Sequence, residues 1–200
     1  MPMTLVVVGL GNPGKEYEKT RHNAGRIAVE LLAKQEKLET FVFNKKSNAL
    51  VTKGVLAGKN AVFVLPETRM NLSGRTVAAY VKSVKSAKGL LVIHDDLDLP
   101  LGTIKMVMAR GSGGHKGVES IMRSVKTKDY ARIRIGVAPA GKNNQAKKLK
   151  DEEKVFKYVI GTFKPSEEAE LRKALKKTVE AARLFAEIGV EAAMQFANTR

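Results

Sequence analysis

The sequence contains no cysteine and no tryptophan among its 200 residues. Without cysteine, disulfide bonds and thiolate metal sites are excluded, and the composition agrees with a cytoplasmic protein. No apolar run approaches the roughly 20 residues of a membrane span. The N-terminal Met-Pro-Met-Thr carries no basic region and no cleavage site, so we expect no secretion signal and no contact with a membrane.

Acidic residues are also scarce. The chain has 20 Asp and Glu against 36 Lys and Arg, which gives a formal net charge of +16. A lysine-rich thermophilic surface would raise the acidic residues as well, so the imbalance favours a polyanionic partner, namely nucleic acid. Aromatic residues make up only 6%. This argues against a base-stacking platform and favours contacts with phosphates.

Hydrophobic periodicity predicts alternating strands and helices in one domain that spans residues 1–200. Apolar runs or alternation predict strands over 4–10, 49–56, 60–65, 89–93, 103–108 and 130–137. Helical spacing predicts helices over 22–37, 71–84, 118–125 and 155–160, and C-terminal helices over 166–197 that begin with Ser166 as N-cap. We therefore expect an α/β fold, with a twisted, mixed, mostly parallel sheet and helices on both faces.

Four polar segments leave predicted strand ends, at 11–23, 66–71, 94–100 and 110–117. In folds of this class, sites form at the carboxyl ends of strands. These segments are therefore expected to meet. A further segment, 139–150, is polar and basic without periodicity, so we expect a mobile basic loop there.

Residues Gly9 to Gly14 match the Gly-x-Gly-x-x-Gly pattern of dinucleotide-binding loops. In those loops an apolar helix follows at once, and an acidic residue ends the second strand. Here several polar residues follow Pro13-Gly14, and no acidic residue lies near Leu56. We therefore interpret the glycines as a tight turn that exposes Asn12, and expect no nucleotide cofactor.

His22 is the first candidate for a catalytic base, since it lies where a helix begins and the helix dipole disfavours its protonation. Asn12, Asn23 and, at a neighbouring strand end, Asp95 are its expected neighbours. Asn71 is expected either to cap a helix or to point into the site, with nothing in the sequence to decide.

The other two histidines have different expected roles. His94 ends an apolar strand and is expected to be packed, whereas His115 lies in a glycine-rich loop that suits a phosphate or backbone contact. His94, Asp95, Asp96 and Asp98 resemble a metal-ligand set, but strand alternation places them on different faces. We therefore expect no metal.

The motifs together resemble bacterial-type peptidyl-tRNA hydrolases. They are Gly9-Leu-Gly-Asn-Pro-Gly14, Tyr17, Thr20-Arg-His-Asn-Ala-Gly25, Met70-Asn-Leu-Ser-Gly74, His94-Asp-Asp-Leu-Asp-Leu-Pro100, Gly113-Gly-His-Lys-Gly117 and Arg132-Ile-Arg-Ile-Gly136. The resemblance implies a phosphorylase/hydrolase-like fold and a monomeric esterase without cofactor. Such an enzyme cleaves the ester between an N-blocked aminoacyl group and tRNA.

The resemblance also implies roles for individual residues. His22 resembles the general base, Asp95 the carboxylate that orients it, Asn12 the residue that distinguishes blocked from free aminoacyl-tRNA, and Asn71 the amide that binds substrate. Tyr17, Met70 and the loop with His115 resemble parts of the groove for the acceptor end and the peptide. The basic residues expected to contact tRNA phosphates are Lys105, Arg110, Arg132, Arg134 and Lys142.

Two positions depart from the family pattern. Lys116 stands where the family usually has Asn, and Arg69 where it often has an aromatic residue. Lys116 lacks an amide carbonyl but adds a charge that can reach a phosphate. An alternative hypothesis is a hydrolase-like protein that binds RNA without catalysis, which the basic charge supports equally well.

Overall fold

The computed structural model describes residues 4–139, 141, 145–147 and 151–199. The prediction about a secretion signal concerns residues 1–3 and lies outside the described residues. Lys142 and part of the expected mobile loop, 139–150, also lie outside them.

One seven-stranded sheet has the order β2-β3-β4-β1-β5-β7-β6. The four central strands, β4, β1, β5 and β7, are parallel, whereas β2, β3 and β6 join antiparallel at the two edges. The strands are β1 (Leu5–Gly9), β2 (Val42–Asn44), β3 (Ala49–Leu56), β4 (Lys59–Pro66), β5 (Leu90–Pro100), β6 (Ile104–Met108) and β7 (Ala131–Ala138). The mixed sheet of the predicted fold is confirmed.

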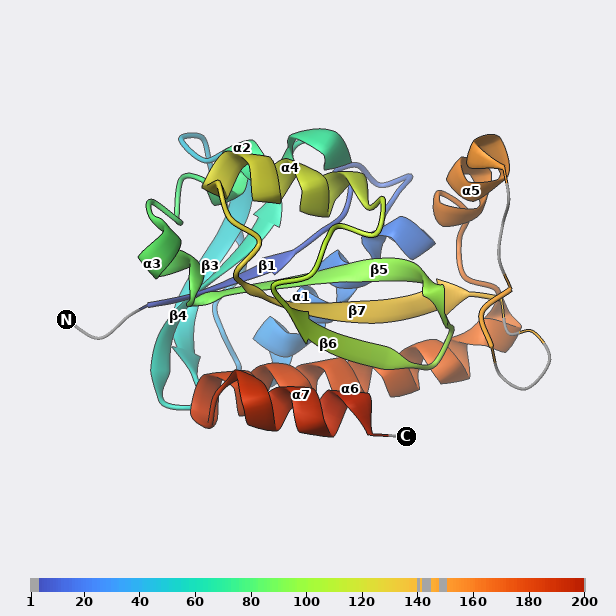
Figure 1. The fold of residues 1–200 in the computed structure, drawn as a ribbon. Coiled ribbons are helices and arrows are strands. Elements are labelled where there is room, and N and C mark those ends of the chain that lie inside the picture. Colours follow the sequence, from blue (N-terminus) through green and yellow to red (C-terminus); the bar gives the residue numbers. More distant parts are fainter. Residues whose placement is uncertain (1–3, 140, 142–144, 148–150, 200) are drawn as a thin grey trace.

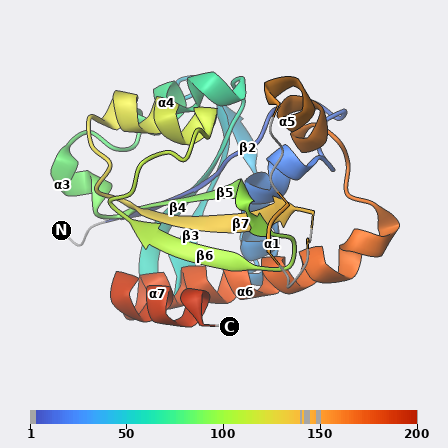
Figure 2. The same cartoon turned by 45° about the vertical axis from the view of Figure 1, so that its right-hand side comes forward.

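Helices cover both faces of the sheet (Figure 1). One layer is formed by α1 (Ala24–Gln35), α6 (Glu168–Glu187) and α7 (Val190–Asn198), and the other by α2 (Ser73–Val77), α3 (Val84–Ala87) and α4 (Lys116–Val125). The helix α5 (Glu152–Val159) stands apart, beside the first loop (Figure 2). No helix in the described part of the chain has the length and apolar character needed to cross a membrane.

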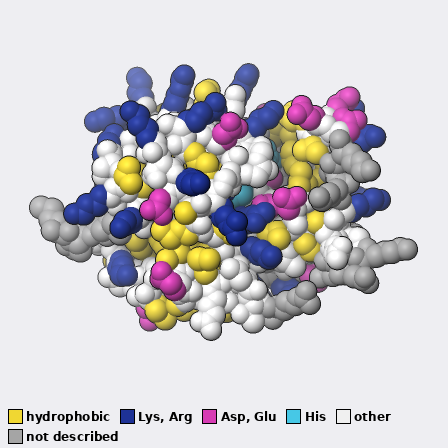
Figure 3. Space-filling view, in the orientation of Figure 1, with side chains coloured by type: hydrophobic (Ala, Val, Ile, Leu, Met, Phe, Trp, Pro, Cys, Tyr) yellow, Lys and Arg dark blue, Asp and Glu magenta, His cyan; other side chains and the backbone are white. Residues whose placement is uncertain are grey.

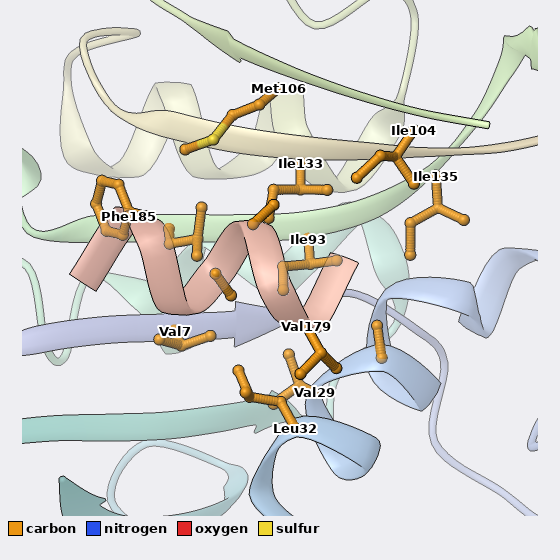
Figure 4. Packing of buried hydrophobic residues seen from close by; sticks show 14 of the residues in the cluster. Val7, Val29, Leu32, Ile93, Ile104, Met106, Ile133, Ile135, Val179 and Phe185 are labelled. Atoms are coloured by element: carbon orange, nitrogen blue, oxygen red, sulfur yellow. The ribbon is translucent and has the colours of Figure 1, made fainter. Parts of the chain in front are cut away.

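Alternate residues of β1 enter different cores, which explains its continuous apolar sequence. Val7 packs in the core beneath α1, α6 and α7, with Ile93 and Ile133 from the neighbouring strands (Figure 4). Val6 and Val8 pack in the second core, against residues of α2 and α4. The central strands are therefore buried on both faces. β1 ends at Gly9, opposite Ile93 of β5, so the mid-strand residue Asp95 lies beyond the carboxyl end of β1.

Three predicted boundaries were wrong. The helix expected over 71–84 is interrupted: a 3-10 turn, η2 (Met70–Leu72), precedes α2, and the extended Ser83 caps the separate α3 through a hydrogen bond with the Ser86 N–H. Residues 94–100 continue β5 instead of forming a loop, because β7 pairs with them. The turn η4 (Pro165–Glu167) precedes α6. The N-cap position is Lys164 for η4 and Glu167 for α6, so Ser166 caps neither.

Candidate active site

The glycines of the first loop let α1 approach the sheet closely. A Cβ on Gly25 would lie 2.1 Å from the Ile93 carbonyl oxygen of β5, and one on Gly11 would lie 2.9 Å from the Asn23 side chain. Gly14 has φ of +110°, which favours glycine. The turn at Gly14 agrees with the prediction, whereas the close approaches of Gly11 and Gly25 were not predicted. They place the 3-10 turn η1 (Arg21–Asn23), which carries His22, beside the middle of β5.

His22 and Asp95 form a hydrogen-bonded pair. His22 Nδ1 lies 3.0 Å from both carboxylate oxygens of Asp95. The Asp95 side chain is 3% exposed, and that of His22 is 17% exposed. Among the residues that the structure describes, none hydrogen-bonds to Nε2 of His22. The carboxylate therefore fixes the Nδ1–H tautomer and leaves Nε2 with a free lone pair.

His115 is the second histidine on the same carboxylate. Its Nε2 lies 2.9 Å from Asp95 Oδ1, and its Nδ1 accepts hydrogen bonds from the backbone N–H groups of Gly117 and Val118, at 3.2 and 3.3 Å. Because Nδ1 accepts, the proton is on Nε2 and is donated to Asp95. His115 thus caps α4 and supports Asp95. The predicted backbone contact is confirmed. The alternative prediction, a phosphate contact through the ring nitrogens, was wrong because both nitrogens are occupied.

The pKa of His22 is raised, whereas the helix dipole predicted that protonation of His22 would be disfavoured. Burial lowers the pKa of His22, but the charge of Asp95 and its hydrogen bond outweigh it, so the pKa lies above its ordinary value; Lys116 opposes this rise. Burial would raise the pKa of Asp95, yet His22 and His115 hold it well below its usual range. The carboxylate is therefore charged, and it makes His22 more basic.

His94 completes a cluster that contains all three histidines of the chain. Its ring packs edge-on against that of His115, with 4.6 Å between centroids, and its Nδ1 lies 2.7 Å from the Asp95 backbone oxygen. Burial lowers the pKa of His94 well below its ordinary value. His94 is packed and neutral, as expected for a core residue.

Asn12 is held in one orientation by the loop that follows β4. Its Oδ1 accepts the backbone N–H of Met70 at 3.0 Å, and Asn23 bonds both backbone groups of Asn12, at 2.8 and 3.0 Å. Since the carbonyl oxygen is occupied, Asn12 presents its NH₂ group as a donor. Met70 itself is 6% exposed and packs against Gly117, so its expected place in the groove is corrected to a core position.

The remaining predicted groove residues are more open. Asn71 is exposed and caps no helix, because α2 follows Leu72 without a side-chain cap; its role in the site stays a prediction. Tyr17 is half-buried in the first loop, and Arg69 and Lys116 are exposed.

Arg132 is not available to a ligand. It is 1% exposed, and its Nη2 donates to the carbonyl oxygens of Arg110 and Gly111, at 2.8 and 2.9 Å. The prediction of a phosphate contact was therefore wrong: the strand face that carries it is covered by the 110–115 loop. Lys105 is exposed and lies opposite Arg134, which pairs with Asp96.

Three side chains could form a metal site, because their ligand atoms lie within 4.8 Å of one another: His22, Asp95 and His115. These differ from the set that the sequence suggested. To bind a metal through Nε2, His115 would have to carry its proton on Nδ1, which accepts two backbone N–H groups. The donor set therefore fits a hydrogen-bonded network better than a metal.

The structure brings His22 and Asp95 together as predicted, and Asn12 contacts Asn23, but the sequence did not predict the hydrogen bond from His115 to Asp95. The signal available was the helix start at Lys116, which makes the preceding residue an N-cap. A histidine at the N-cap accepts helix N–H groups with one ring nitrogen and can donate to another group with the other.

An α/β fold that holds a histidine against a buried carboxylate, beyond the carboxyl end of β1, suits an enzyme that activates water, such as a hydrolase. The family model described as Peptidyl-tRNA hydrolase matches residues 6–200. The chain belongs to the peptidyl-tRNA hydrolase family.

Relatives named peptidyl-tRNA hydrolase match over nearly their whole length. That of Thermodesulfovibrio yellowstonii is 41% identical over 197 residues, 97% of this chain and 98% of the relative. That of Aquifex aeolicus is 39% identical, over 96% and 95%. The crystal structure of peptidyl-tRNA hydrolase from Acinetobacter baumannii superimposes with a TM-score of 0.87 at 31% identity, over 100% of this chain and 96% of that one.

Proposed function

We propose that the chain hydrolyses the ester bond of peptidyl-tRNA, with His22 as the general base that activates water. The observation that carries this proposal is the His22–Asp95 pair, with Nδ1 bound to the carboxylate at 3.0 Å and Nε2 free. Family membership supplies the ester and the class of reaction.

The reaction needs one proton transfer in each direction. Water bound to His22 Nε2 gives up a proton as its oxygen bonds to the ester carbonyl carbon, and the imidazolium then returns that proton to the ribose oxygen as the carbon–oxygen bond breaks. Asp95 stabilises the imidazolium without itself taking the proton. Neither cofactor nor metal enters these steps.

Asn12 and Asn71 are proposed to bind the acyl part of the substrate. The NH₂ group of Asn12, fixed by Met70 N–H, suits a carbonyl oxygen of the first peptide group. A free aminoacyl ester ends in an ammonium and offers no such acceptor. An unpaired buried group costs about 1–3 kcal/mol, which favours the blocked substrate. Tyr17 and Arg69 are proposed neighbours of the same substrate.

The charge distribution supports tRNA as the partner. In the layer of α2, α3 and α4, residues 69–88 and 116–129 carry nine Lys and Arg and two Asp and Glu. All nine cations are exposed, and no described residue forms an ion pair with them. Figure 3 shows Lys and Arg side chains projecting over α2 and α4. We propose that this layer, with Lys105, Arg110 and Arg134, attracts phosphates, and that the enzyme acts as a cytoplasmic monomer.

Incubation with N-acetyl-aminoacyl-tRNA and with aminoacyl-tRNA, both in EDTA, tests the proposal. We expect release of the acyl group from the blocked substrate only. His22→Ala should lower turnover by roughly 100- to 10,000-fold while tRNA binding persists. Tight tRNA binding without any release would instead support the RNA-binding alternative, and loss of activity in EDTA would implicate a metal.

A further inference from the structure

Arg21, which directly precedes His22, is a buried cation that the proposed reaction does not use. Its side chain is 5% exposed, and its Nη2 lies 2.7 Å from Glu167 Oε2 in η4. Its guanidinium stacks 4.3 Å from the ring centroid of Tyr158 and 5.5 Å from that of Phe163. One side chain thus joins the turn of the catalytic base to three residues of the segment 158–167.

The backbone makes the same connection. Arg21 N–H donates to the Gly161 carbonyl at 3.0 Å, and Thr20 forms an antiparallel bridge with Thr162. A Cβ on Gly161 would lie 3.1 Å from Arg21 Nη1, so this glycine lets the guanidinium come close. The segment that follows α5 is therefore aligned along the end of the first loop.

The helix α5 has few other attachments. Most of its residues are exposed, including Phe156 at 60%, and only Val159 is buried. Beyond the contacts of Arg21, Tyr158 Oη donates to the Val137 carbonyl at 2.8 Å. Because so little apolar surface of α5 is buried, its position depends strongly on Arg21 and Glu167.

This position matters because α5 borders the hollow above the histidines. Figure 3 shows a histidine side chain at the bottom of a hollow, with hydrophobic side chains on the side that adjoins α5. We infer that Arg21 is a positioning residue: through Glu167 and Tyr158 it holds α5 as a wall that binds the peptidyl part of the substrate. This inference rests on the proposed function for its substrate.

Arg21→Met tests the inference. With the side-chain anchor of α5 removed and the His22–Asp95 pair intact, we expect KM for N-acetyl-aminoacyl-tRNA to rise about tenfold, as for removal of a charged hydrogen bond. The turnover number should change less than twofold, and its pH profile should not shift. Arg21→Lys should restore part of the binding. Adding Glu167→Gln to Arg21→Met should raise KM no further, because both changes remove the same pair.

Arg183→Met is the matched control. Arg183 pairs with Glu36 at the same distance, 2.7 Å, but joins α6 to the end of α1. We expect KM to be unchanged in this variant. Hydrogen exchange should accelerate over 152–167 in Arg21→Met and stay unchanged there in Arg183→Met.

Unchanged exchange over 152–167 in Arg21→Met would overturn the anchoring, and faster exchange with unchanged KM would overturn the role of α5 as a substrate wall. A shifted pH profile with unchanged KM would show that Arg21 acts on His22 instead. If the unmodified chain released no acyl group, the proposed function would fail, while the exchange measurement would still decide the anchoring.

Discussion

Asp95 is a buried carboxylate that accepts from two imidazoles through different nitrogens, Nδ1 of His22 and Nε2 of His115. Both rings can donate while neutral, so the site needs only one net negative charge at rest. When His22 takes a proton, the carboxylate already faces it. The site is therefore preorganised for the charge that the reaction creates.

Asp95→Asn should lower turnover on the order of 100-fold and move the acid limb of the pH–rate profile to lower pH. The carboxylate raises the pKa of His22 against burial and Lys116, so its removal leaves only the influences that lower this pKa. An amide also presents an NH₂ group to one of two N–H donors, which disturbs the His22 tautomer. A pH–rate profile measures both effects; an unchanged acid limb would contradict the assignment of the base.

Lys116→Met should move the acid limb in the opposite direction. The Lys116 charge lowers the pKa of His22, so without it this pKa rises further and the neutral base requires higher pH. Lys105→Met, which changes an exposed lysine on β6, is the control and should leave the acid limb in place. If both variants shifted the limb equally, a general change of surface charge would be responsible.

At the scale of elements, the site depends on how closely the start of α1 approaches β5. Gly25→Ala should destabilise the fold by at least about 1–3 kcal/mol, as for overpacking, because its Cβ would lie 2.1 Å from the Ile93 carbonyl oxygen. It should also reduce turnover by separating His22 from Asp95. Gly111 has open space around it and no positive φ, so Gly111→Ala should change neither.

Thermal unfolding and turnover of the two glycine variants are the measurements. A Gly25→Ala protein with normal stability and normal turnover would show that the close approach is not required.

The elements were predictable where a pattern is local, and less so where a contact is long-range. The buried strand Leu5–Gly9 and the residues His22, Asp95 and Asn12 follow from periodicity and from motifs at strand ends. The burial of Arg132 could not be predicted in this way. Strand alternation shows on which face of the sheet a side chain lies, but not that a loop about 20 residues away covers that face. The role of His115 depends on which nitrogen faces Asp95, and only the folded loop decides this.

At the scale of the whole molecule, charge is distributed unequally between the two helical layers. The layer of α2, α3 and α4 has a large cationic excess, whereas α1, α6 and α7 together carry seven Lys and Arg and six Asp and Glu. Several of these cations form ion pairs, such as Arg183 with Glu36, just after α1, and Arg172 with Glu168. The net charge of +16 is therefore distributed unevenly, with a larger cationic excess on the layer of α2, α3 and α4.

Reversing charge on the basic layer should weaken tRNA binding in a salt-dependent way. For Lys82→Glu with Lys85→Glu, we expect a higher Kd at low salt. The slope of log K against log salt should become shallower by up to about 0.9 for each phosphate that the layer no longer neutralises. Lys34→Glu with Lys176→Glu makes the same change of charge on the opposite layer. An equal weakening by the two pairs would show that only total charge matters.

The gathering of all three histidines around Asp95 gives this protein a built-in spectroscopic probe. No histidine lies elsewhere in the chain, so every imidazole resonance in an NMR titration originates from the site and needs no subtraction of background. We expect one resonance to titrate above the ordinary histidine pKa, for His22, and that of His94 to stay neutral far into the acid range. Substrate analogues can then be followed at the reacting group itself, without an added label.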